Sequence, residues 1–311
     1  MKKTIIYFMI LSAVLVSCAG EDDLTPSNVK DNWFEADSDA NDPESVLRRN
    51  FYNETKIYLL FNDTLRHEYI GKNADGKELY DTELVDFNYT ITNYDDFAYR
   101  QITYLSTMQE KEAAAAFVKN YLLPHIKGSK MQPFSVMLVK EILYDRRGYE
   151  EDAVPVSYYA GRRCTALAVS GVADMDSEDQ ESYADDILYN MVSTTFNDAD
   201  YETKVPFYDI SENYAGFYPY YEYYEDHFDD FDPDNWTDEE ALEIAHKYGF
   251  LSYSGRWSPY FPSSSVDVKD YMDAVWDYTP EAFEEEYGDN PIIMEKYNWM
   301  RNFILGLGYK F

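Results

Sequence analysis

Histidine and cysteine are scarce in this sequence, which has four histidines and two cysteines among 311 residues. The histidines are His67, His125, His227 and His246. None lies within four residues of another, so the short histidine-pair motif that binds zinc is absent. A metal site assembled from distant parts of the fold remains an alternative. Cys164 begins the apolar run "CTALAVSG", which favours a buried, inert thiol over the alternative of a nucleophile.

Positive charge is also in short supply. The chain has 26 Lys and Arg against 59 Asp and Glu, giving a formal net charge of −33. Binding of phosphate backbones depends on cations that displace counterions, so this balance argues against DNA or RNA as a partner. No P-loop, dinucleotide fingerprint or nucleophile elbow occurs in the sequence.

The main long apolar run is "TIIYFMILSAVLV" near the start, preceded by "MKK". It is short for a membrane-spanning helix and has the form of a signal peptide. Its end, Leu15-Val16-Ser17-Cys18, resembles the bacterial lipobox, in which the signal is cut before a cysteine that carries lipid. We expect residues 1–17 to be a lipoprotein signal peptide and Cys18 to be lipidated. An ordinary secretory signal with an incidental cysteine is the alternative.

The chain after Cys18 begins with the acidic stretch "AGEDD". Acids at this position resemble the signal that sends Bacteroidota lipoproteins to the cell surface. The resemblance implies a lipid-anchored protein of the outer membrane that faces the cell exterior. Residues 18–45 are polar, acidic and without periodicity, which predicts a flexible tether. Residues 46–311 are expected to form a single domain.

Patterns along that domain predict an α+β fold: a small N-terminal sheet with one or two helices, followed by a mostly helical C-terminal half. Strands are predicted over 54–62, 134–144 and 164–173 from their apolar content and flanking breakers. A helix is predicted over 106–126, ended by Pro124.

Two capping boxes predict helix starts in the second half of the chain. Ser177 with Gln180 is expected to start a helix through "YADDILYNMVSTTF", and Thr237 with Glu240 another through "ALEIAHKYGF". Further helices are predicted for "DVKDYMDAVW", "TPEAFEEEYG" and "IIMEKYNWMRNFILGLG".

Acidic residues suggest two further kinds of site. Asp230, Asp232 and Asp234 have the spacing of a calcium loop, but Asn235 replaces the glycine and Ala241 the glutamate of that loop. The capping box at Thr237 explains this stretch more simply, and calcium is not expected. Paired carboxylates for glycoside hydrolysis stay possible and cannot be located among 59 acids.

Tyrosine is abundant, with 32 residues, and it is densest in "ENYAGFYPYYEYYEDHFDDFDPDNW". Aromatic faces flanked by carboxylates can hold sugar rings. The residues of this candidate ligand surface are Tyr220, Tyr221, Tyr223, Tyr224 and Trp236. The alternative is a loop that packs its rings against the helical half.

Several loose motifs, in order, carry a family resemblance: "KNYLLPHI", "QPFSVMLV", "RRCTALAVSGV", the helix capped at Ser177, "VPFYDISENY", "ALEIAHKYGFLSYS", "DVKDYMDAVW" and "MEKYNWMRNFI". With the lipobox, this organisation resembles the substrate-import-associated zinc metallohydrolase lipoproteins of Bacteroidota, which are also described as zinc-binding metallopeptidases. The resemblance spans the chain and implies a metallopeptidase-like fold.

Active relatives carry HExxH on the capped helix, with two zinc-binding histidines and a glutamate as general base. In the best overlay, Tyr189, Asn190 and Ser193 stand at those positions. A phenol, an amide and a hydroxyl suit neither role. The resemblance therefore implies a degenerate metal site, with no catalytic residues, no metal ligands and no cofactor, where active relatives hold zinc.

These expectations point to a surface lipoprotein that is a pseudoenzyme and acts as an accessory or binding component in the import of glycans or peptides. Its implied partners are the membrane, through Cys18, together with an outer-membrane importer and its glycan-binding lipoprotein. One alternative is an active hydrolase with a rearranged metal or carboxylate site. Another is a glycan-binding lipoprotein from an unrelated family.

Overall fold

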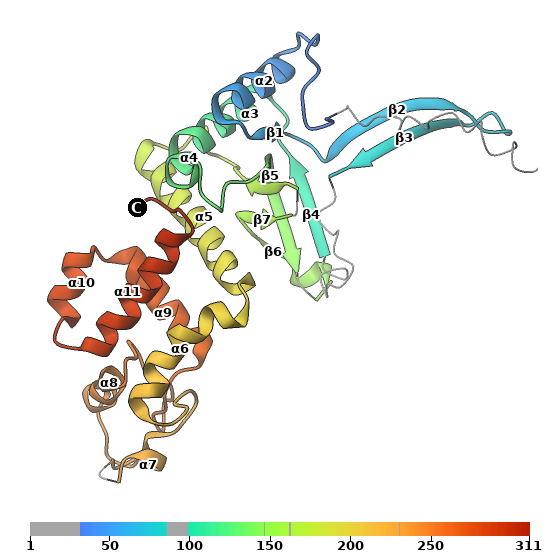
Figure 1. Cartoon of the computed structure of the whole chain (residues 1–311). Helices are drawn as coiled ribbons and strands as arrows, with labels where there is room; N and C mark the ends of the chain where they lie inside the picture. Colours follow the sequence, from blue (N-terminus) through green and yellow to red (C-terminus); the bar gives the residue numbers. More distant parts are fainter. Residues whose placement is uncertain (1–31, 86–98, 146, 162, 230) are drawn as a thin grey trace, which may run out of the picture.

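The computed structural model describes residues 32–311 apart from 86–98, 146, 162 and 230. A mixed sheet with flanking helices forms one end of an elongated molecule, and helices form the other (Figure 1). The elements of the first half are α2 Pro43–Thr55, β1 Tyr58–Leu60, β2 Thr64–Lys72, β3 Glu78–Leu84, β4 Tyr99–Tyr104, α3 Met108–Phe117, α4 Leu123–Ile126, β5 Ser135–Asp145, β6 Val154–Pro155, β7 Tyr158–Ala160 and β8 Thr165–Ala168. Those of the second half are α5 Ser177–Asp198, α6 Tyr201–Ala215, α7 Tyr224–His227, α8 Asp238–Lys247, α9 Ser264–Asp277, α10 Pro280–Tyr287 and α11 Pro291–Gly306. The α+β prediction is confirmed.

Strand β5 is the centre of the sheet. Its first half pairs in parallel with β1 and β8, and its second half pairs antiparallel with β4 and β6. Strand β7 closes the order by pairing antiparallel with β8. The first five residues of β5 are all buried, because helices cover one face of the sheet and a smaller apolar cluster with Phe34 and Tyr58 covers the other. This explains why β5 reads as a continuous apolar run.

The hairpin of β2 and β3 forms a separate two-stranded sheet that projects from the sheet end (Figure 1). Its turn contains Gly76 at a φ of +80°, a conformation that glycine adopts without strain. The hairpin is antiparallel, with Tyr69 opposite Tyr80.

The helix predicted over 106–126 is broken where the prediction had it continuous. A wider π-helical turn, Val118–Leu122, separates α3 from α4, and the amide of Leu123 bonds to the carbonyl of Val118. Pro124 then lies in the first turn of α4, where its missing N–H costs nothing. Pro124 therefore starts a short helix instead of ending a long one.

The long helix α5 begins as expected, but its cap differs by one residue. Asp176, not Ser177, is the N-cap, and its carboxylate accepts a hydrogen bond from the amide of Asp179. The side chain of Gln180 donates to the carbonyls of Val172 and Met175. The predicted capping box at Thr237 is confirmed.

The predicted tether is wrong over its last part. Phe34 is buried, and Arg48 donates hydrogen bonds to the carbonyls of Phe34 and Leu59. Arg49 donates to the carbonyl of Asp37. The acidic composition of this segment did not indicate these contacts, because the two arginines bond to backbone carbonyls and not to acidic side chains. Residues 1–31, which include Cys18 and the predicted signal, lie outside the described part of the chain.

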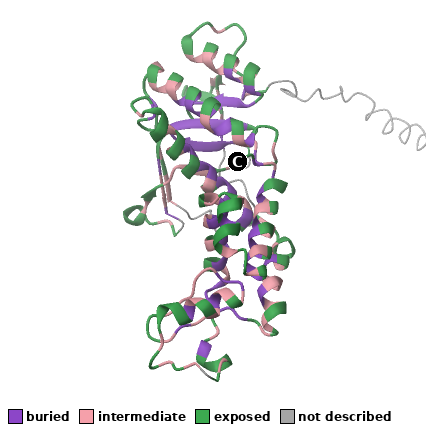
Figure 2. Ribbon diagram, turned by 90° about the vertical axis from the view of Figure 1, so that its left-hand side faces the viewer, coloured by how far each residue is buried: buried purple, intermediate pink, exposed green. Residues whose placement is uncertain are grey.

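The helical half has two apolar clusters. Buried residues of α5, α6, α9, α10 and α11 join the main core under the sheet, and Figure 2 colours the buried residues purple on both the strands and the helices. A smaller cluster near the far end gathers around Tyr224, Phe250 and Phe261. Among the described residues, no helix has both the length and the apolar character that a membrane span requires.

Candidate functional site

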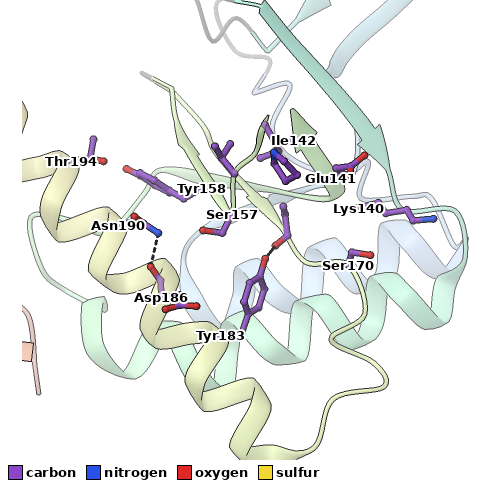
Figure 3. A pocket seen from close by; sticks show the side chains of 13 residues that line it. Lys140, Glu141, Ile142, Ser157, Tyr158, Ser170, Tyr183, Asp186, Asn190 and Thr194 are labelled. Atoms are coloured by element: carbon purple, nitrogen blue, oxygen red, sulfur yellow. Dashed lines mark hydrogen bonds between the residues drawn. The ribbon is translucent and has the colours of Figure 1, made fainter. Parts of the chain in front are cut away.

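A cleft of about 690 Å³ lies between the sheet and α5 (Figure 3). Four parts of the chain line it: β5, the segment from β6 to β7, the end of β8 with its following loop, and α5. The lining residues are Lys140, Glu141, Ile142, Pro155, Val156, Ser157, Tyr158, Ala168, Ser170, Tyr183, Asp186, Asn190 and Thr194.

Helix α5 gives the cleft one polar face, made of Tyr183, Asp186, Asn190 and Thr194. These positions are three or four residues apart, so they lie along one side of the helix. The hydroxyl of Tyr183 donates to the carbonyl of Ala168 at 2.6 Å, which ties α5 to the end of β8. Asn190 donates to the backbone carbonyl of Asp186 at 2.8 Å. The face is therefore held in place by its own hydrogen bonds.

Two phenols of the cleft have raised pKa values. Burial raises the pKa of Tyr158 to about 12, with a smaller contribution from the negative charge of Asp198. Burial also raises the pKa of Tyr183, helped by the charge of Asp186. Both side chains stay protonated under physiological conditions.

The carboxylates of the cleft stand on different walls. Glu141 is on β5 and Asp186 is on α5 (Figure 3). With Lys140 and the hydroxyls of Ser157, Ser170 and Thr194, they place polar groups among apolar lining residues such as Ile142 and Val156. Such a lining suits a ligand with many hydroxyl or amide groups.

Of the three positions that the resemblance aligns with HExxH, only Asn190 lines the cleft. The hydroxyl of Tyr189 donates to Asp273 of α9 at 2.6 Å, and its ring meets Trp276 edge-on. Tyr189 therefore connects α5 to α9. Ser193 is half-buried and is not among the lining residues. Two pairs at i and i+4 line the cleft, Asp186 with Asn190 and Asn190 with Thr194, and the sequence overlay used neither.

The cleft does not fit zinc, because its lining contains no histidine or cysteine. Across the described residues, no group of three or more His, Cys, Asp or Glu side chains is placed to hold a metal ion. The four histidines lie on separate elements, in β2, α4, α7 and α8.

Each of these histidines has local surroundings of its own. His67 bonds to Thr82, His125 to the carbonyl of Lys310 and His227 to Glu222. Nε2 of His246 is buried without a hydrogen-bond partner. Burial lowers the pKa of His246, which favours its neutral form.

The acidic stretch before α8 forms a turn. Asp232 accepts a hydrogen bond from the backbone amide of Asp234, and Thr237 and Glu240 cap the following helix. Asp230, the first residue of the calcium-loop pattern, lies outside the described residues. Turn and cap account for the acids that are described.

The predicted tyrosine surface is wrong for two of its five residues. Tyr220 and Tyr224 are buried, and the hydroxyl of Tyr220 donates to Asp267 at 2.9 Å. Tyr221 and Tyr223 are exposed, while Trp236 is half-buried. Alternation along the chain explains this split, because Tyr224 points into the far apolar cluster and its neighbour Tyr223 points outward.

Cys164 is buried, as predicted for an inert thiol. Burial raises its pKa to about 12, so the reactive thiolate is scarce at neutral pH.

No protein-family model matches the chain, and neither the curated proteins nor the solved structures include a match to it. The relationship to the zinc metallohydrolase lipoproteins stays a prediction from the sequence.

Proposed function

We propose that this chain is a non-catalytic binding lipoprotein whose cleft between the sheet and α5 holds a polar segment of a glycan or peptide. The observation that carries the proposal is the lining of the cleft, which presents hydroxyls, phenols, an amide, a lysine and two carboxylates and contains no histidine or cysteine. The family resemblance and the lipobox support the further proposal that the protein is an outer-membrane lipoprotein that faces the exterior, beside a nutrient importer.

The proposal is tested by blocking the cleft. Asn190 is exposed and lines it, so Asn190→Trp should fill the space without disturbing the core. Asn197 is exposed on the same helix outside the lining and supplies the control, Asn197→Trp. Calorimetric titration with a panel of soluble oligosaccharides and oligopeptides should show binding that Asn190→Trp weakens and Asn197→Trp leaves unchanged. Equal affinity in both variants would refute the cleft as the binding site.

An active hydrolase is the second candidate, because Glu141 and Asp186 both line the cleft and glycoside hydrolysis uses two carboxylates. Product analysis after incubation with the bound oligosaccharide separates the two functions. Cleavage that is lost in Asp186→Asn would establish the hydrolase. About one equivalent of zinc in protein purified without chelators would also contradict the non-catalytic proposal.

Membrane attachment is tested separately. Cys18→Ala should move the protein from the membrane fraction to the soluble fraction of the producing cell, because the lipid would no longer be attached. Membrane retention of this variant would contradict the lipobox assignment.

A further inference from the structure

The loop 254–260 presents a tryptophan to solvent at the helical end of the molecule. Trp257 is 82% exposed, the highest value among the exposed large apolar side chains of the described residues. The loop is closed by two backbone hydrogen bonds between Ser254 and Tyr260, each 2.9 Å long. Sequence reasoning passed over this residue, because "SGRWSPY" has no periodicity to mark it.

The loop is held in one conformation. Gly255 has a φ of +95°, and a Cβ at this position would lie 2.2 Å from the carbonyl oxygen of Ser258. Only glycine fits there. Ser258 also donates a hydrogen bond to Glu225 in α7. A tight loop of this kind keeps Trp257 outside the core, although burial would stabilise a side chain of this size.

Two tyrosines of the predicted ligand surface belong to the same unit. Residues 221–224 run antiparallel to residues 259–261, with hydrogen bonds from Tyr221 to Phe261 and from Tyr224 to Pro259. Tyr221 is 64% exposed and adopts a φ of +67°, which is unfavourable for a tyrosine. Tyr223 is 43% exposed. The pairing thus holds Tyr221 and Tyr223 outward on the unit that carries Trp257.

The chemistry of this end narrows the class of ligand. Among the described residues from 201 to 260, every exposed large apolar side chain is a tyrosine or the tryptophan. The exposed apolar area of this segment is therefore aromatic, the kind of surface that stacks on sugar rings. Glu225 and Asp226 are exposed acids beside Tyr223 and Tyr224 in the chain, and they disfavour an anionic membrane surface. The guanidinium of Arg256 lies over one face of the Trp257 ring, 5.3 Å from its centroid, which leaves the other face for a ligand.

We propose that Trp257, Tyr221 and Tyr223 form a binding platform for a neutral polysaccharide chain. Aromatic faces stack on the C–H faces of sugar rings, and the phenol, indole and carboxylate groups bond to the hydroxyls. The platform is separate from the cleft at α5, so it goes beyond the function proposed above.

Affinity gel electrophoresis of the chain from residue 18 onward, carrying Cys18→Ala, tests the platform against soluble neutral polysaccharides: a mannan, a β-glucan and a starch. At least one should retard the protein. Trp257→Ala should weaken that binding by about tenfold or more, as for an aromatic hot spot. Tyr221→Gly should weaken it as well, and glycine relieves the positive φ, so misfolding would not explain the loss. Tyr69→Ala, which removes an exposed ring on the β2–β3 hairpin, is the matched control and should bind normally.

Other outcomes would overturn the platform. Retardation by none of the polysaccharides, or equal retardation of Trp257→Ala and the parent, would refute it. Loss of binding in Asn190→Trp with retention in Trp257→Ala would assign the sugar to the cleft, supporting the proposed function and not the platform. A shift in tryptophan fluorescence with phosphatidylcholine vesicles but not with polysaccharide would assign Trp257 to a membrane surface instead.

Discussion

Replacing Lys296 with methionine should destabilise the protein by about 3–5 kcal/mol, the usual effect of removing one partner of a buried ion pair. Lys296 and Asp267 are fully buried, and Nζ lies 2.7 Å from both carboxylate oxygens. Nζ also donates to Ser211 at 3.0 Å. These contacts connect α6, α9 and α11.

The variant would leave the charge of Asp267 buried with the hydroxyl of Tyr220 as a remaining hydrogen-bond partner. Methionine fills the space of the lysine stem, so the loss comes from charge and not from a cavity. At about 2–4 °C per kcal/mol for a chain of this size, the melting temperature should fall by about 6–20 °C.

The pH dependence gives a second readout with a definite sign. Burial raises the pKa of Asp267, and the lysine opposes that shift. In the parent protein, the pair binds the same number of protons folded and unfolded near neutrality. In Lys296→Met, the raised pKa makes Asp267 take up a proton on folding. The stability lost should therefore grow as the pH rises from about 5 to 8, by at most about 1.4 kcal/mol per unit.

Thermal and urea unfolding, followed by circular dichroism at both pH values, would measure these effects. Lys269→Met is the matched control, because Lys269 is exposed and pairs with Asp273 on the surface, so its effect should stay within about 0.5 kcal/mol. The double variant Lys296→Met with Asp267→Asn removes both charges and keeps an acceptor for Tyr220. It should recover part of the loss. A single variant as stable as the parent, or a double variant no better than the single, would refute the reasoning.

Three further predictions follow from α5 and from Cys164. The double variant Asp186→His with Asn190→His should bind zinc in a competition titration, because these two positions share the cleft face. The double variant Tyr189→His with Ser193→His should bind zinc more weakly, and tighter binding by this second variant would contradict the assigned face. Tyr189→Phe should lower the free energy of unfolding in urea by about 1.5–3 kcal/mol, because the Tyr189 hydroxyl bonds to the carboxylate of Asp273. An unchanged unfolding midpoint would show that this bond does not stabilise the protein. In the Cys18→Ala protein, Cys164 should react with a thiol reagent only after denaturation, because its pKa is about 12 and it is buried; rapid labelling of the folded protein would contradict this.

Features that depend on neighbours along the chain could be predicted from the sequence. The order of sheet then helices and the capping box at Thr237 could both be predicted, because apolar runs and caps act over a few residues. The buried thiol of Cys164 was also readable from the apolar run around it. The signal and lipidation at Cys18 stay predictions of the sequence alone.

Tertiary structure decided which face of each element is used. Tyr189 turned out to bond to α9 while Asn190 faces the cleft, although the two are adjacent in the chain. Tyr224 is buried and Tyr221 exposed because residues 221–224 pair with 259–261, which no local pattern encodes.

The buried ion pair of Lys296 and Asp267 is another feature that only the tertiary structure decided. Lys296 and Asp267 are 29 residues apart, and each reads as an ordinary surface charge on its own helix. Only the packing of α9 against α11 removes both from water and brings them to 2.7 Å. The sequence by itself determined the order of sheet then helices and the position of the capped helices, because these depend on local hydrogen bonds and apolar spacing. Tertiary structure alone decided which side chains meet, because that depends on contacts between residues far apart in the chain.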